Sequence, residues 1–149
     1  MRVTLLAATM LGSMGMATNA QPVTPESSGL GAISGAMRYA GSPWLDHAVH
    51  DVGTNPTGWK RQWCAKSMNL WLERSGKRGC GGNTAISCLN AGRRLSGPQV
   101  GALAVMAHHV GIVKEVSGNS VTLVSGNHNR KVGVGKYPRG RVVAYVWPE

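Results

Sequence analysis

Gln62-Trp63-Cys64-Ala65 places one of the chain's three cysteines where an amphipathic helix is expected to begin. Apolar residues then recur with the period of an α-helix, at Cys64, Met68, Trp71 and Leu72. Gly76 follows as a C-terminal stop. At a helix start, the unpaired N–H groups and the positive end of the helix dipole stabilise a thiolate. Cys64 is therefore a candidate nucleophile, and the alternative is a small apolar residue on a buried stripe.

The first twenty residues have the anatomy of a secretory signal peptide. Arg2 is their only charge, Val3 to Met16 is an apolar run, and Thr18-Asn19-Ala20 is a small-residue cleavage site. The run is shorter than the ~20 apolar residues that a membrane-spanning helix needs. We therefore predict a signal peptide at 1–20, a flexible linker at 21–30 and one globular domain at 31–149. The mature protein is expected in the periplasm or outside the cell, without an integral membrane segment.

The chain is strongly basic, with 16 Lys and Arg against 6 Asp and Glu and a formal net charge of +10. Such a surface attracts polyanions. The sequence has no aromatic-and-basic RNA motif and no zinc-finger spacing, so we favour anionic cell-wall polymers over nucleic acid as partners. His47 and His50 have no third ligand, and HExxH, GxSxG and GxxxxGK[ST] motifs are absent. We accordingly predict a monomer without a metal or another cofactor.

Three cysteines in an oxidising compartment favour one disulfide and one free thiol. Cys80 and Cys88 flank a Gly-rich segment, so a local loop can close between them. Closing so short a loop stabilises the fold by roughly 2.5 kcal/mol in the chain-entropy model. We therefore predict a Cys80–Cys88 disulfide that leaves Cys64 free, with this segment at the border of the substrate cleft. The alternative is three reduced, partly buried thiols.

Helical signals precede strand signals along the chain. Ser42-Pro43 opens a short helix through Val49, Cys64 begins a second, and Asn83 or Thr84 caps a third that reaches about Ala91. Short β-branched or alternating runs follow, at 102–107, 109–116, 121–125, 130–134 and 141–147. Helices followed by closely spaced strands predict an α+β fold with an antiparallel sheet.

A cysteine nucleophile needs a base and a third group that orients the base. His109 stands at the start of a predicted strand, and His108 remains the alternative because adjacent strand residues face opposite ways. The six carboxylates are poorly placed for the third role, so an amide from 121–129, VTLVSGNHN, is favoured. Asn127 is the first choice. The alternatives are Ser125, His128 and Asn129.

Four segments in order, QWCA, HVGIV, SGNHN and YPRGRVVAYVWP, resemble the NlpC and CHAP type of papain-like cell-wall cysteine hydrolases. The resemblance is to the short secreted bacterial branch with W-C-A, H-V-G and G-G-N or S-G-N motifs. It extends from about Pro43 to Pro148. It implies a papain-like α+β fold in which the nucleophile begins a helix packed on a sheet that carries the histidine.

The resemblance also implies a function. Cys64 matches the nucleophile, His109 the base and Asn127 the polar third residue, with Trp63 and His128 expected beside them as substrate-binding residues. Such an enzyme hydrolyses peptide or amide bonds of peptidoglycan through an acyl-enzyme. The sequence leaves open which bond is cleaved and whose wall is attacked. It also leaves two alternatives: a non-catalytic basic wall-binding protein on the same fold, and a secreted antibacterial amidase toxin.

Overall fold

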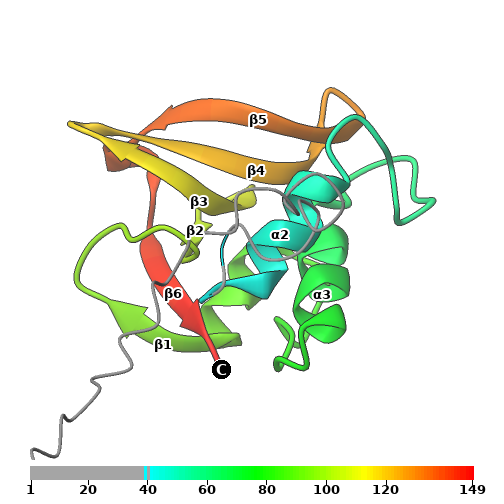
Figure 1. Ribbon diagram of the computed structural model, residues 1–149, viewed down its shortest axis with the longest axis horizontal. Helices are drawn as coiled ribbons and strands as arrows, with labels where there is room; N and C mark the ends of the chain where they lie inside the picture. The colour runs from blue at the N-terminus through cyan, green and yellow to red at the C-terminus, as the bar shows by residue number, and fades with distance from the viewer. Residues whose placement is uncertain (1–38, 40) are drawn as a thin grey trace, which may run out of the picture.

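The computed structural model describes residue 39 and residues 41–149. The predicted signal peptide at 1–20 and linker at 21–30 lie outside the described residues. Within the described part, two α-helices and two 3-10 helices accompany one six-stranded sheet in which the paired strands are antiparallel (Figure 1). The α+β class predicted from the sequence is therefore confirmed.

The two α-helices begin where their local signals placed them. Helix α2 (Pro43–His50) has Ser42 as its N-cap residue and proline at its first position. Helix α3 (Cys64–Arg74) begins at the cysteine itself, and Gly76 follows it in the left-handed conformation with φ of 67°. The third predicted helix is a 3-10 helix, η1 (Ala85–Asn90), preceded by Thr84. A second 3-10 helix, η2 (Arg139–Arg141), lies just before the last strand.

The sheet has the strand order β1-β6-β2-β3-β4-β5. Its strands are β1 (Gly92–Leu95), β2 (Leu103–Val105), β3 (Val110–Ser117), β4 (Ser120–His128), β5 (Lys131–Pro138) and β6 (Ala144–Pro148). The sequence analysis identified no strand at β1, which forms by pairing with β6 near the end of the chain. Strands β4 and β5 extend beyond the predicted runs because the residues at 135–138 of β5 pair with those at 120–123 of β4, an interaction that local alternation does not encode.

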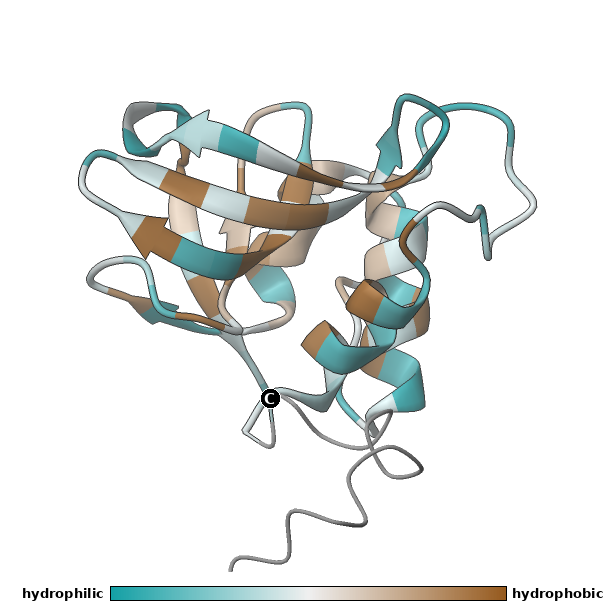
Figure 2. Cartoon of the chain, turned by 45° about the horizontal axis from the view of Figure 1, so that its top comes forward, coloured by the Kyte–Doolittle hydropathy of each residue, from teal (hydrophilic) through white to brown (hydrophobic). Residues whose placement is uncertain are grey.

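Both faces of the sheet are buried. Leu103 and Val105 of β2 pack with the helices in one core, which contains Trp44 and Trp71. The residues between and beside them, Ala102, Ala104 and Met106, belong to a second core with Val113, Val121, Leu123 and Tyr145. Towards the edge of the sheet, β5 alternates between buried or partly buried and exposed residues, and Figure 2 shows hydrophobic and polar residues alternating along several strands. Successive side chains of a strand point to opposite faces of the sheet. A strand residue near the site therefore faces either the first core or the second.

Helix α3 makes its closest approach to the sheet at Gly126 of β4. A Cβ atom added there would clash with the Ser67 hydroxyl and would lie 2.8 Å from Ser67 Cβ and 2.9 Å from Trp63 Cε3. The Ser67 hydroxyl is itself committed, because it donates a hydrogen bond to the carbonyl of Cys64 at 2.8 Å. Glycine at 126 thus lets the first turn of α3, with Cys64, rest directly on β4.

Gly126→Ala is expected to lower the free energy of unfolding by about 1–3 kcal/mol, because overpacking a tight contact forces the backbone apart. Chemical denaturation measures the change. Gly140→Ala is the matched control, since a Cβ atom at Gly140 meets nothing within 4 Å. Equal stability of the two variants would show that the helix does not depend on this contact.

Candidate active site

Cys64 is the one free cysteine, and it is buried with 7% of its surface exposed. Cys80 and Cys88 form a disulfide, so the predicted pairing is confirmed. As the first residue of α3, Cys64 lies where backbone N–H groups have no partner within the helix. These groups favour negative charge on the sulfur or on a nearby oxygen.

A cavity of about 240 Å³ opens at Cys64. It brings together the start of α3, the segment before η1, the loop between β2 and β3, and the end of β4. Its lining residues are Gln62, Cys64, Asn83, Thr84, Ala85, Ala107, His108, His109 and Asn127. The segment between the disulfide cysteines therefore borders the cavity, as the sequence analysis expected.

His109 is held by two contacts beside this cavity. Its Nε2 lies 2.9 Å from the hydroxyl oxygen of Ser125, which is fully buried, and its ring stacks on Tyr137 with centroids 5.7 Å apart. The contact with Ser125 leaves Nδ1 as the nitrogen for proton transfer. His108, by contrast, is exposed. The geometry therefore favours His109 over His108 as the oriented imidazole.

The hydrogen-bond partner of His109 is Ser125 and not Asn127, which was the first choice. Side chains alternate along a strand, and Ser125 lies beside Gly111 of β3, where an added Cβ atom would be 3.1 Å from Ser125 Cβ. Asn127 falls at an irregularity in the β4–β5 pairing and has φ of 57°. It lines the cavity instead, where its amide is available to a ligand.

Two residues expected to bind substrate have other surroundings. Trp63 is fully buried and packs against Gly126. It therefore has a packing role next to Cys64 and offers no surface to a ligand. His128 lies over Gly133 and Gly135 of β5, with its Nδ1 3.4 Å from the Tyr137 hydroxyl. His128 is not among the residues that line the Cys64 cavity.

Burial lowers the pKa of His109 below its ordinary value of 6.5, and the charges of His128 and Arg141 lower it further. Both effects penalise the imidazolium. His109 is therefore neutral at pH 7 and able to accept a proton. Because the folded-state pKa is lowered, this group costs stability as the pH falls below 6.5 and has no effect well above that value.

Within 41–149 and at residue 39, no group of three or more His, Cys, Asp and Glu side chains is arranged to hold a metal ion. His50, one of the two histidines of α2, contacts the carboxylate of Asp51 at 3.3 Å. No helix in this part of the chain is long and apolar enough to cross a bilayer.

Sequence reasoning missed two contributors to the site. Tyr137, which stacks on His109, comes from a stretch beyond the predicted end of its strand. The larger basic cavity beside the site, described below, was also not identified. The alternation of side chains along paired strands could have favoured Ser125 as the residue on the same face as His109. No local signal in the sequence indicates Tyr137.

Comparison with known proteins adds no identification. No protein-family model matches the chain, and no curated protein or solved structure matches it either.

His128→Gln is expected to raise the pKa of His109 toward 6.5, because the variant removes a nearby positive charge while burial persists. An NMR titration of the histidine ring protons measures the change. His50→Gln is the control, since that side chain is 86% exposed on α2. An unchanged or lowered His109 pKa in His128→Gln would contradict this electrostatic account.

Proposed function

We propose that this protein is a papain-like cysteine hydrolase that cleaves peptide or amide bonds of bacterial peptidoglycan. The observation that carries the proposal is the shared cavity, which is lined both by a free cysteine at a helix start and by an imidazole that a buried hydroxyl orients. A cysteine, a base and an orienting group are the three parts that nucleophilic catalysis requires. The resemblance of the QWCA, HVGIV and SGNHN segments to NlpC and CHAP hydrolases supports the same chemistry.

In the proposed reaction His109 accepts the thiol proton of Cys64, and the sulfur attacks the substrate carbonyl carbon. The negative charge on the carbonyl oxygen is stabilised by N–H groups at the start of α3. His109 then donates its proton to the leaving amine, so that the C–N bond breaks and a thioester remains. Water, deprotonated by His109, attacks the thioester. The acid product leaves, and the proton on His109 returns to the sulfur to regenerate the Cys64 thiol.

The assignment of a cell-wall substrate is supported by other features of the sequence. The chain carries a net charge of +10 and begins with a segment typical of export, so an anionic extracellular polymer is a suitable target. The same charge also favours a second candidate, a non-catalytic protein that binds the wall through its basic surface. The two candidates differ in whether Cys64 is needed.

Incubation of purified sacculi with the protein is expected to release soluble muropeptides, detected by chromatography and mass spectrometry. Cys64→Ala should reduce the release to background while leaving the fold intact, because the side chain contributes the only nucleophile in the proposal. Release by the variant at the wild-type rate would refute the assignment of Cys64. Salt-sensitive binding by both proteins with no release by either would favour the binding function.

In a plot of kcat/KM against pH, the midpoint of the acid limb should lie below pH 6.5. This limb reports the pKa of the base in the free enzyme, and the pKa of His109 is lowered. His128→Gln should move the limb to higher pH in parallel with the His109 pKa. A soluble peptide product measured across pH 4 to 9 gives the profile. A limb that stays in place while the His109 pKa moves would exclude His109 as the titrating base.

A further inference from the structure

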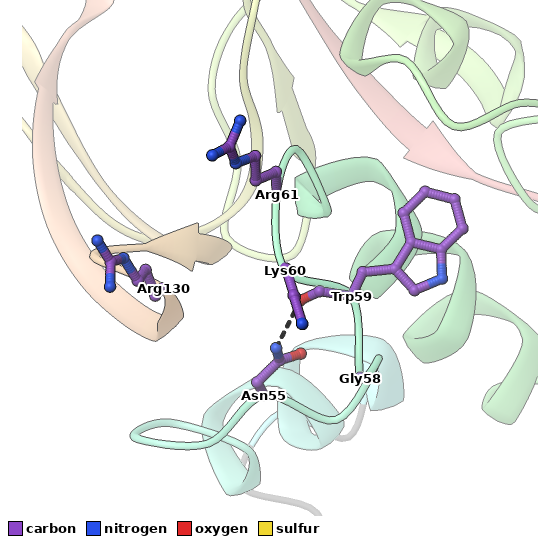
Figure 3. Close-up of a pocket in the computed structure, with 6 residues that line it drawn as sticks. All are labelled: Asn55, Gly58, Trp59, Lys60, Arg61 and Arg130. Atoms are coloured by element: carbon purple, nitrogen blue, oxygen red, sulfur yellow. Dashed lines mark hydrogen bonds between the residues drawn. The ribbon is translucent and has the colours of Figure 1, made fainter.

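A second cavity, of about 440 Å³, plays no part in the proposed chemistry. It lies between the loop before α3 and the turn that joins β4 to β5. Its lining residues are Asn55, Gly58, Trp59, Lys60, Arg61 and Arg130, so half of them are basic (Figure 3). No carboxylate is among them.

The three cations of this cavity have no ionic partner among the described residues. The arginine–carboxylate bridges in that part of the chain join Arg74 to Asp51 and Arg93 to Glu149, at 3.1 and 3.7 Å. Lys60, Arg61 and Arg130 therefore line the cavity as exposed cations without a protein counter-ion. An anion that entered the cavity would be attracted by all three.

The loop wall of the cavity is organised by its own hydrogen bonds. Asn55 donates through its side-chain amide to the carbonyl of Trp59 at 2.8 Å, the bond drawn in Figure 3. Its side-chain oxygen accepts bonds from the N–H and the hydroxyl of Thr57 at 3.1 and 2.8 Å. The Trp59 ring extends away from Arg61 and Arg130 in Figure 3, and the Lys66 ammonium of α3 lies 5.2 Å from its centre. These bonds hold the loop that carries Lys60 and Arg61 in one conformation.

Arg130 occupies a backbone position that a glycine would fill at lower cost. It forms a two-residue hairpin turn with Asn129, and φ is 53° at Asn129 and 65° at Arg130. Turns with positive φ at both central residues favour Asn-Gly. A side chain in this conformation costs about 1–2 kcal/mol. A residue held in such a conformation points to a role for its side chain.

The basic cavity and the Cys64 cavity are lined by residues that lie close together in the sequence, on two segments of the chain. Arg61 lines the basic cavity and the next residue, Gln62, lines the Cys64 cavity. On the other segment, Arg130 lines the first and Asn127 the second. Since Arg61 is three residues from Cys64 and Arg130 is three residues from Asn127, one extended peptide could occupy both cavities.

We propose that the basic cavity is a specificity subsite that binds a carboxylate of an acidic peptide whose scissile amide lies at Cys64. This inference rests on the proposed function. The planar guanidinium groups of Arg61 and Arg130 match a carboxylate, and Lys60 adds a point charge. The subsite selects substrates with a free acid near the cleaved bond.

The binding test uses the full chain carrying Cys64→Ala and stem peptides prepared from sacculi, with their carboxylates either free or amidated. Isothermal titration calorimetry should give a Kd about tenfold lower for the free acid, as expected for charge-assisted hydrogen bonds in a solvent-accessible site. Adding Arg61→Gln and Arg130→Gln should abolish that difference. Arg78→Gln with Arg94→Gln is the matched control for net charge, at exposed positions outside the cavity.

Arg130→Gly provides a variant in which the fold is not at risk, because glycine fits the left-handed turn position. It should be at least as stable as the wild type and should still lose most of the preference for the free acid. Retention of the preference in Arg130→Gly and in the double variant would overturn the proposal. Equal affinity of the Cys64→Ala chain for acid and amide would overturn it as well.

Turnover separates this inference from the proposed function. Wild-type protein that hydrolyses the acid and the amidated peptide at equal kcat/KM would be a hydrolase without the subsite. Absence of hydrolysis of either peptide, together with no release from sacculi, would refute the hydrolase. The preference measured by calorimetry with Cys64→Ala would still decide whether the cavity binds carboxylates.

Discussion

The contact between the first turn of α3 and Gly126 determines where the cysteine lies relative to the sheet. The Ser67 hydroxyl occupies the space that a side chain at position 126 would need, and it binds the carbonyl of Cys64. Trp63, fully buried beside them, completes the contact. Because β4 contributes no side chain to this contact, the first turn of α3, with Cys64, lies next to the strands that position His109 and Ser125.

The double-sided sheet explains why His109 is both held and kept neutral. Its ring lies on the side of the second core, between the Ser125 hydroxyl and the Tyr137 ring. Arg141 lies on Tyr137 in turn, with its guanidinium carbon 5.8 Å from the ring centre. Burial and the neighbouring cations disfavour the imidazolium, and this arrangement keeps a base available near neutral pH.

Charge is distributed unevenly around the two cavities. The Cys64 cavity is lined by amides, hydroxyls and imidazoles, whereas the adjoining cavity carries three cations. Asp51, a buried carboxylate, binds Trp71 and Arg74 at the other end of α3 and so has a structural role. No carboxylate lines the basic cavity, so its three cations remain unneutralised by its own lining.

Local signals in the sequence determined the starts of both α-helices, the position of Cys64 in a first turn, the α+β class and the Cys80–Cys88 pairing. Each depends on residues close in sequence: a proline at a helix start, an apolar period, or two cysteines around a short loop. Strand β1, the partner of His109, the burial of Trp63 and the basic cavity were decided by tertiary structure. They depend on strand register and on the approach of a helix to Gly126, and register follows from pairing between distant segments. A one-residue shift in register exchanges the two faces of a strand, so the choice between Ser125 and Asn127 required the folded sheet.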